Sequence, residues 1–341
     1  MKAIFLHAAV GVLASLGLMG SAAAQDTVTL RYATHLGATH VGVLEADIPF
    51  MTAAKKNSGG TLDFQHFPAE QAGKALQMYD LIKAGAVDIG IVSPAYVTEK
   101  MPLLGVWEIP GLASSACDIV DLMDDLGAPG GMIYESDFGP NGVRALAYLP
   151  FPGYTIAPSG KPITSLEDLH GKKIRVAGGL MELVSVALGG VPVKMPSPEI
   201  YQSLQRGTID AVMFSYVSVK AYDMQTAAPY GTTGFNLGAP GNVVLISERK
   251  FQSLTEDQRS ALIEAGKTAS QHWCHYMDAA EAQSIEDLKN DGMEIYEWTP
   301  EQVAQLTALS KHIPLDWAAR VDAMNKPGTE ILEIFTKAMS K

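Results

Sequence analysis

Arg175 is the residue whose type and position carry the most chemistry in this sequence. It lies near the end of the predicted strand Lys173–Val176, just before Gly178 and Gly179. A guanidinium is planar and permanently charged, so it can hold a carboxylate through two parallel hydrogen bonds. At the surface the same residue would form an ordinary salt bridge, and the residues by themselves leave both interpretations open.

The glycine pair beside Arg175 does not belong to a nucleotide-binding motif. Neither G-x-G-x-x-G nor G-x-x-x-x-G-K-[ST] is present around Gly178 and Gly179. The backbone N–H groups there are instead candidate donors to a ligand. The sequence also lacks a G-x-S-x-G elbow that would present a nucleophilic serine. We therefore predict a protein that is not an enzyme, with no catalytic residue and no cofactor.

A histidine pair and two cysteines are the remaining groups that could do chemistry. His272 and His275 stand one helical turn apart around Cys274, but no second ligand pair with zinc spacing accompanies them. We expect no metal there. Cys117 and Cys274 leave a disulfide and two buried free thiols equally open, because sequence separation says nothing about geometry. We expect a fold stabilised by its core and not by cross-links.

Two α/β units must position these residues. Strands alternate with helices in each half, which is typical of a parallel sheet. The expected strands are 28–33, 61–67 and 87–92 in the first half, and 173–176, 191–193 and 209–213 in the second. Each half also has a helix, a glycine stop and a strand, with Asp88 and Asp210 at the same offset. The cleft between the carboxyl ends of the strands is the expected ligand site.

The first residues and the charge limit the compartment and the partners. Met1–Ala24 has a positive start, an apolar run and small residues at a cleavage position, which predicts a secretory signal cleaved after Ala24 and a periplasmic protein. No later run of about 20 apolar residues follows. A formal net charge of −12 argues against nucleic acid and anionic membrane surfaces as partners.

The central block of the sequence, Gly171–Asp210, closely resembles the solute-binding proteins of TRAP transporters, the dicarboxylate-binding or DctP-type family. Residues 58–62, 71–73 and 85–88 of the first half agree with it. The resemblance implies an α/β, two-lobed periplasmic-binding-protein (flytrap) fold with a hinge and long crossing helices. It implies a small and a large membrane subunit as partners. The expected parts are a signal peptide 1–24, lobe I from 25–150 plus about 240–280, lobe II from 151–239 plus about 281–310, and helices 311–341 packing across both lobes.

By the same resemblance, Arg175 pairs with the carboxylate of an organic acid. Five further positions match the family's cleft: His35, Ser93, Thr155, Ser215 and Asn236. Sialic-acid-binding members have a second arginine where this chain has Thr155 and an asparagine where it has Ser215. Arg175 therefore remains as the single clamp for an anionic group. Four aromatic residues are expected around it: Tyr96, Tyr154, Phe214 and Tyr216.

This pattern favours a monocarboxylate with an apolar or aromatic body as the ligand. The alternative ligand is a C4-dicarboxylate or a 2-oxoacid, with its second charge met by His35 or by water. The alternative classes of protein are a ligand-sensing subunit and a periplasmic enzyme.

Overall fold

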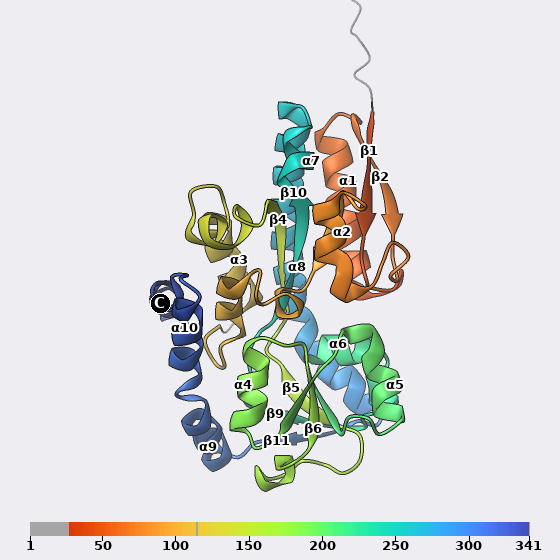
Figure 1. The fold of residues 1–341 in the computed structure, drawn as a ribbon. Coiled ribbons are helices and arrows are strands. Elements are labelled where there is room, and N and C mark those ends of the chain that lie inside the picture. Colours follow the sequence, from red (N-terminus) through yellow and green to blue (C-terminus); the bar gives the residue numbers. More distant parts are fainter. Residues whose placement is uncertain (1–26, 114, 341) are drawn as a thin grey trace, which may run out of the picture.

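The computed structural model describes residues 27–113 and 115–340, and the expected signal peptide lies outside them. The chain forms two α/β lobes, one above the other in Figure 1. This confirms the predicted fold class. Within the described residues, no helix combines the length and the apolar composition that a membrane span requires.

The first lobe is built on a five-stranded mixed sheet. Its strands, in spatial order, are β2 (Leu62–Phe67), β1 (Val28–Ala33), β3 (Ile89–Val92), β10 (Gly241–Ser247) and β4 (Val143–Pro150). The first three run parallel, and β10 is antiparallel to both of its neighbours. The helices of this lobe are α1 (Ile48–Asn57), α2 (Met78–Ala84), α3 (Ala116–Leu126) and α7 (Glu248–Gln252).

The second lobe is built on a four-stranded sheet. Its order is β5 (Thr155–Pro158), β8 (Ala211–Phe214), β6 (Lys173–Val176) and β7 (Val191–Lys194), with β5 antiparallel to β8. A small parallel pair, β9 (Tyr230–Thr233) and β11 (Glu294–Glu297), lies beside it. The helices are α4 (Leu180–Ala187), α5 (Ile200–Gln205) and α6 (Tyr216–Ala221).

The two aspartates at matching offsets have matching structural roles. Asp88 accepts hydrogen bonds from the backbone N–H and the Nε of Arg31 on β1, at 2.9 and 3.0 Å. Asp210 accepts one from the backbone N–H of Lys173 on β6, at 2.8 Å. Before each aspartate, Gly85 and Gly207 end a helix with positive φ angles of 77° and 67°. In both lobes, therefore, the same turn fixes one strand against its parallel neighbour.

Helix α8 (Glu256–Asn290) is 35 residues long and joins the lobes. It packs on α1, α3 and β4 of the first lobe and on α6 of the second. Gly266 lets it approach β4 closely, because a Cβ there would stand 1.7 Å from the carbonyl oxygen of Leu146. Trp273 donates from Nε1 to the carbonyl of Pro150 at 2.6 Å. Close backbone packing and this buried bond fix α8 on the first sheet.

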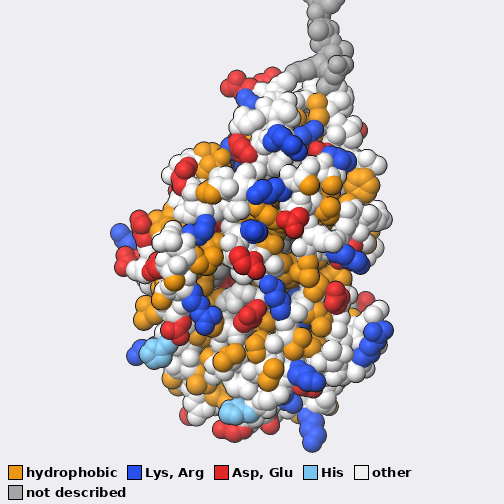
Figure 2. Space-filling view, in the orientation of Figure 1, with side chains coloured by type: hydrophobic (Ala, Val, Ile, Leu, Met, Phe, Trp, Pro, Cys, Tyr) orange, Lys and Arg blue, Asp and Glu red, His pale blue; other side chains and the backbone are white. Residues whose placement is uncertain are grey.

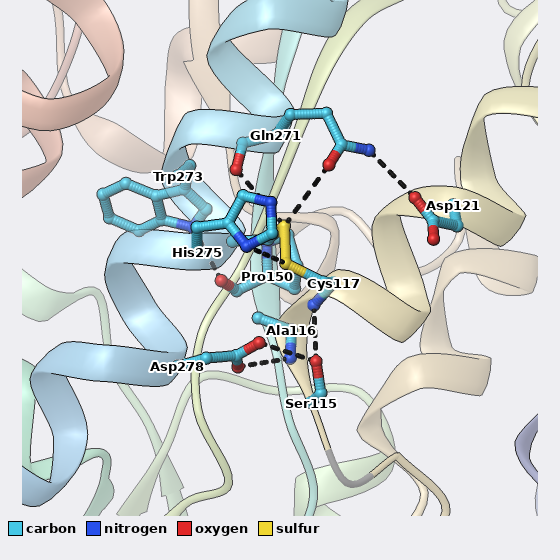
Figure 3. Close-up of a disulfide and its surroundings, with 10 residues drawn as sticks. Ser115, Ala116, Cys117, Asp121, Pro150, Gln271, Trp273, His275 and Asp278 are labelled. Carbon is cyan, nitrogen blue, oxygen red and sulfur yellow. Dashed lines mark hydrogen bonds between the residues drawn. A yellow bond between two sulfur atoms is a disulfide. The ribbon is translucent and has the colours of Figure 1, made fainter.

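A disulfide joins Cys117 of α3 to Cys274 of α8, with a Cα–Cα distance of 4.8 Å (Figure 3). The expectation of a fold without cross-links is wrong on this point. The two residues are 157 positions apart, and only the packing of α3 on α8 brings them together.

Three helices end the chain: α9 (Pro300–Ser310), α10 (Ile313–Ala323) and α11 (Gly328–Met339). Helix α10 contacts α4 of the second lobe, and α11 contacts α3 and the 3-10 helix Pro102–Glu108 of the first. On the face drawn in Figure 2, acidic and basic side chains are interspersed with hydrophobic ones. On this face the net negative charge is therefore not gathered into one patch.

Candidate ligand site

A small cavity between the lobes brings together six of the ten predicted site residues. They are His35, Ser93, Tyr96, Tyr154, Arg175 and Phe214. The space free of protein atoms at this site, open solvent included, is about 380 Å³. His35 and Ser93 follow strands β1 and β3, whereas Arg175 lies near the end of β6 and Phe214 at the end of β8. The cavity thus lies at the carboxyl ends of strands from both sheets, as expected for an α/β protein.

Arg175 is buried in this cavity, with 1% of its surface exposed. Its Nε donates to the carbonyl of Met195 at 2.9 Å, and its Cζ lies 5.3 Å from the ring centre of Phe214. Within the described residues, Nη1 has no hydrogen-bond partner and no carboxylate forms an ion pair with this guanidinium. The burial excludes the surface salt-bridge interpretation. A buried charge without a counter-ion is destabilising by several kcal/mol, so this site favours an anion.

The wall that the first lobe contributes is neutral. His35 and His40 both line the cavity and are both 5% exposed. Burial lowers the pKa of each imidazole to about 4, and for His35 the charge of Arg175 adds to this while Glu70 opposes it. Both rings are therefore neutral at pH 7. Among the described residues lining the cavity, Arg175 has the only permanent charge.

Aromatic rings form much of the remaining wall. The rings of Tyr154 and Phe214 meet edge to face at 5.4 Å, and Phe214 lies 5.8 Å from Tyr222. The hydroxyl of Tyr222 donates to Ser197 Oγ at 3.0 Å, so the ring rather than the hydroxyl is available. Tyr96 of the first lobe accepts from the backbone N–H of Ser197 in the second, at 2.9 Å. This bond closes the cavity across the two lobes.

The four other predicted residues lie outside this cavity and have partners of their own. Ser215 caps α6 and lies 2.9 Å from Ser218 Oγ. Thr155, Tyr216 and Asn236 line a second hollow next to α8. Thr155 and Tyr216 both donate to the carbonyl of Thr232, and Asn236 donates to the carbonyl of Ala113. Thr155 and Tyr216 thus hold β9 within the second lobe, whereas Asn236 joins the segment after β9 to the segment before α3.

The glycine pair after Arg175 does not line the cavity. A Cβ on Gly178 would stand 2.4 Å from the carbonyl oxygen of Ala95, and one on Gly179 would stand 2.9 Å from Glu108 Oε2. The pair is therefore a close contact with the first lobe. Glu108 is 1% exposed and accepts from the backbone N–H of Leu180 at 3.1 Å, where α4 begins. Burial raises its pKa to about 8.

Sequence reasoning missed three residues of this region: His40, Tyr222 and Glu108. The position of His40 in the loop after β1, at the carboxyl edge of the sheet, was a usable signal. Tyr222 and Glu108 gave none, because their contacts join distant parts of the chain.

The two histidines of α8 are engaged separately. His272 Nε2 lies 2.8 Å from Glu45 Oε2, whereas His275 Nδ1 lies 3.5 Å from Cys117 Sγ (Figure 3). Cys117, Cys274 and His275 lie close enough together to resemble a metal site. The two sulfurs are joined in the disulfide, however, and a metal needs the free thiolate.

Comparison with known proteins places the chain in a family. Residues 32–318 match the model for "Bacterial extracellular solute-binding protein, family 7". A solute-binding protein of Albidiferax ferrireducens is 27% identical over 220 residues, which are 64% of each protein and so less than two thirds of that relative's length. The C4-dicarboxylate-binding periplasmic protein of Rhodobacter capsulatus is 24% identical over 80% of this chain and 82% of its own.

Solved structures agree on the fold. A TRAP solute-binding protein from Rhodoferax ferrireducens has a TM-score of 0.83 at 22% identity, over 92% of this chain and 98% of its own. A marine metagenome TRAP solute-binding protein has a TM-score of 0.84 at 20% identity, over the same shares. The chain belongs to the bacterial extracellular solute-binding proteins of family 7, which confirms its resemblance to the solute-binding proteins of TRAP transporters.

Proposed function

We propose that this protein is the periplasmic receptor of a TRAP-type transporter and captures a small monocarboxylate with an apolar or aromatic body. The observation that carries the proposal is the buried guanidinium of Arg175, whose Nη1 lacks a partner among the described residues. A carboxylate bound there would neutralise the charge and fill the vacant hydrogen-bonding position.

The rest of the cavity favours one carboxylate over two. Phe214, Tyr222 and Tyr154 supply apolar surface, and Phe214 lies directly beside Arg175. A second carboxylate would meet the first-lobe wall, where His35 and His40 are neutral at pH 7. A buried anion without a cation is unfavourable, so the C4-dicarboxylate alternative is the weaker one.

The relatives support small organic acids as the ligand class. The Rhodoferax ferrireducens structure contains copurified benzoate, and the marine metagenome structure contains 3-hydroxybenzoate. Another marine metagenome relative contains pyroglutamate. Each of these ligands is a cyclic monocarboxylate. Export by the expected signal segment and delivery to a small and a large membrane subunit complete the proposed role.

A ligand screen tests the proposal. Mature protein is unfolded and refolded to remove carried-over ligand, and its melting temperature is measured with a panel of monocarboxylates and dicarboxylates. A ligand at about 100 times its Kd adds about 2.7 kcal/mol, which raises the melting temperature by a few degrees. Stabilisation by aromatic or branched monocarboxylates is expected. Stabilisation by succinate or malate alone would overturn the assigned ligand class.

Calorimetry on variants tests the role of Arg175. Arg175→Ala is expected to weaken binding about 100-fold or more, and Arg175→Lys to restore part of the affinity because the planar fork is lost. Arg206→Ala, on the exposed end of α5, is the matched control. Near-normal affinity in Arg175→Ala would contradict the proposed function.

A further inference from the structure

His40 presents a hydrogen-bond donor whose position is fixed by the backbone. Its Nδ1 accepts from the N–H of Gly42 at 2.9 Å. Because a backbone N–H can only donate, Nδ1 carries no hydrogen, and in the neutral ring the hydrogen must then lie on Nε2. This Nε2 is buried and has no hydrogen-bond partner within the described part of the chain. The cavity wall therefore contains an N–H donor of known orientation that is unsatisfied.

Gly42 makes this arrangement possible by its lack of a side chain. Its φ of −62° suits any residue. A Cβ there, however, would stand 3.2 Å from His40 Nδ1 and 2.5 Å from Leu36 Cδ1. A larger residue would have to displace the end of Leu36 and shift the imidazole by a few tenths of an ångström. The short loop after β1 is thus shaped around His40.

A series of ring contacts leads from His40 to Arg175. The His40 ring lies 4.7 Å from that of Tyr222, Tyr222 lies 5.8 Å from Phe214, and Phe214 lies 5.3 Å from the Arg175 guanidinium. Two aromatic rings therefore separate the two donors. The hydroxyl of Tyr222 already donates to Ser197, so it has no hydrogen left to donate to a ligand between the two rings.

We infer that the ligand is a flat monocarboxylic acid with a neutral oxygen substituent at the end opposite its carboxylate, and that His40 Nε2–H donates to that oxygen. The inference rests on the proposed function, because Arg175 fixes the carboxylate end. A hydroxyl suits the position best. His35 lines the same cavity and its Nδ1 also lacks a partner among the described residues. A hydroxyl can accept from His40 and donate to His35 Nδ1, in the tautomer of His35 that carries its hydrogen on Nε2.

Paired ligands and paired variants test this inference by calorimetry. Benzoate is compared with 3-hydroxybenzoate and 4-hydroxybenzoate, which add only the distal oxygen. In the unaltered protein one hydroxy acid is expected to bind about tenfold more tightly than benzoate, the effect of one buried hydrogen bond. His40→Phe keeps a ring beside Tyr222 but removes the donor. We expect it to reduce that preference to below about threefold, with the preference measured against benzoate binding in the same variant.

His40→Gln, which restores an N–H donor, is expected to recover part of the preference. Isophthalate and terephthalate, with a charged group at the distal end, are expected to bind more weakly than the hydroxy acids. Equal binding of benzoate and both hydroxy acids, or a preference that survives in His40→Phe, would overturn the inference. The proposed function would still stand in that case if Arg175→Ala abolished binding.

Nitrogen NMR of the unaltered protein gives a reading that does not depend on a variant folding. The His40 ring is expected in the tautomer protonated on Nε2, and its Nε2 signal should shift with hydroxybenzoate but not with benzoate. The opposite tautomer, or an identical shift with both acids, would overturn the inference.

Discussion

Two of the places where the lobes meet treat polar groups in opposite ways. Along α8 the carboxylates are paired: Asp278 accepts from Ser115 Oγ at 2.6 Å and from the N–H of Ala116 at 2.7 Å (Figure 3). One turn further on, Glu281 accepts from the N–H groups of Tyr216 and Val217, both at 2.9 Å. These two side chains cap α3 of the first lobe and α6 of the second.

In the cavity, by contrast, polar atoms are buried without partners. Arg175 Nη1, His35 Nδ1 and His40 Nε2 lack hydrogen bonds within the described residues. Each such group is destabilising by about 1–3 kcal/mol, or more where it is charged. The α8 junction therefore stabilises the protein without ligand, whereas the cavity lowers its stability until a ligand completes the bonds. Closure driven by a ligand requires this kind of differential binding.

The largest effect is expected at Arg175. Arg175→Met replaces the charge by an apolar side chain that fills much of the same space. Binding of the organic acid should weaken about 100-fold or more, while the ligand-free variant should be as stable as the unaltered protein or more stable, because a buried unpaired charge is removed. Chemical unfolding of both proteins without ligand measures this. A ligand-free variant less stable by 2 kcal/mol or more would show that the guanidinium is already satisfied in the ligand-free protein.

Removing the disulfide should have the opposite effect: a loss of stability with little change in ligand affinity. Cys117→Ser combined with Cys274→Ser removes the link between α3 and α8, which closes a long loop of the unfolded chain. The free energy of unfolding is expected to fall by about 2–5 kcal/mol. Ligand affinity, measured by calorimetry below the melting temperature, should change less than threefold. A large loss of affinity would mean that the α8 junction also shapes the cavity.

Local patterns in the sequence predicted the elements that position the candidate site. Strand Lys173–Val176 and the glycine pair marked Arg175 as a candidate, because a strand end next to tight-turn residues is a short-range feature. They left a surface salt bridge equally open, and the family resemblance favoured the ligand role. Thr155, Ser215 and Asn236 were predicted by position in the family, and Tyr216 as one of four aromatic residues around the clamp. In the structure Thr155, Tyr216 and Asn236 bond to backbone carbonyls of other segments, and Ser215 bonds to Ser218 within α6. The family position fixes where a residue lies along the chain, not which way its hydrogen bonds are directed.

Contacts between distant segments could not be predicted. Glu108 reaches the start of α4 across 72 residues, and the disulfide spans 157. His40 meets Tyr222 only when a loop of the first lobe packs against the second. Nothing in the spacing of these residues distinguishes them from other buried side chains.

Glu108 lies between these two cases, because it accepts from a backbone N–H but its burial disfavours the charged form. Its pKa of about 8 in the folded protein lies above its ordinary value of 4.5. The folded state therefore binds the proton more tightly than the unfolded state between these values, and stability contributed by this group is lost as pH rises from about 4.5 to about 8. Glu108→Gln should remove that part of the pH dependence.

Unfolding free energies of the two proteins at pH 5 and pH 8 measure the effect. The unaltered protein is expected to lose on the order of 2 kcal/mol more than Glu108→Gln over this range. Other titrating groups, such as the buried Asp137, are present in both proteins and cancel in the difference. Parallel pH profiles would mean that Glu108 does not take up a proton on folding.

The smallest effects are expected from the two capping carboxylates. Glu281→Gln keeps one oxygen acceptor for the first turn of α6 but turns an NH₂ group toward the other N–H. Asp278→Asn makes the same change at the start of α3. Each should lower the free energy of unfolding by about 1 kcal/mol, as for the loss of a helix cap, and leave ligand affinity within about twofold.

Glu286→Gln on the same helix is the control, because its pair with Lys289 is exposed and should contribute less than about 0.5 kcal/mol. If Glu281→Gln weakened binding while Asp278→Asn did not, the second-lobe cap would belong to the closing movement, and only the first-lobe cap would be a purely stabilising contact.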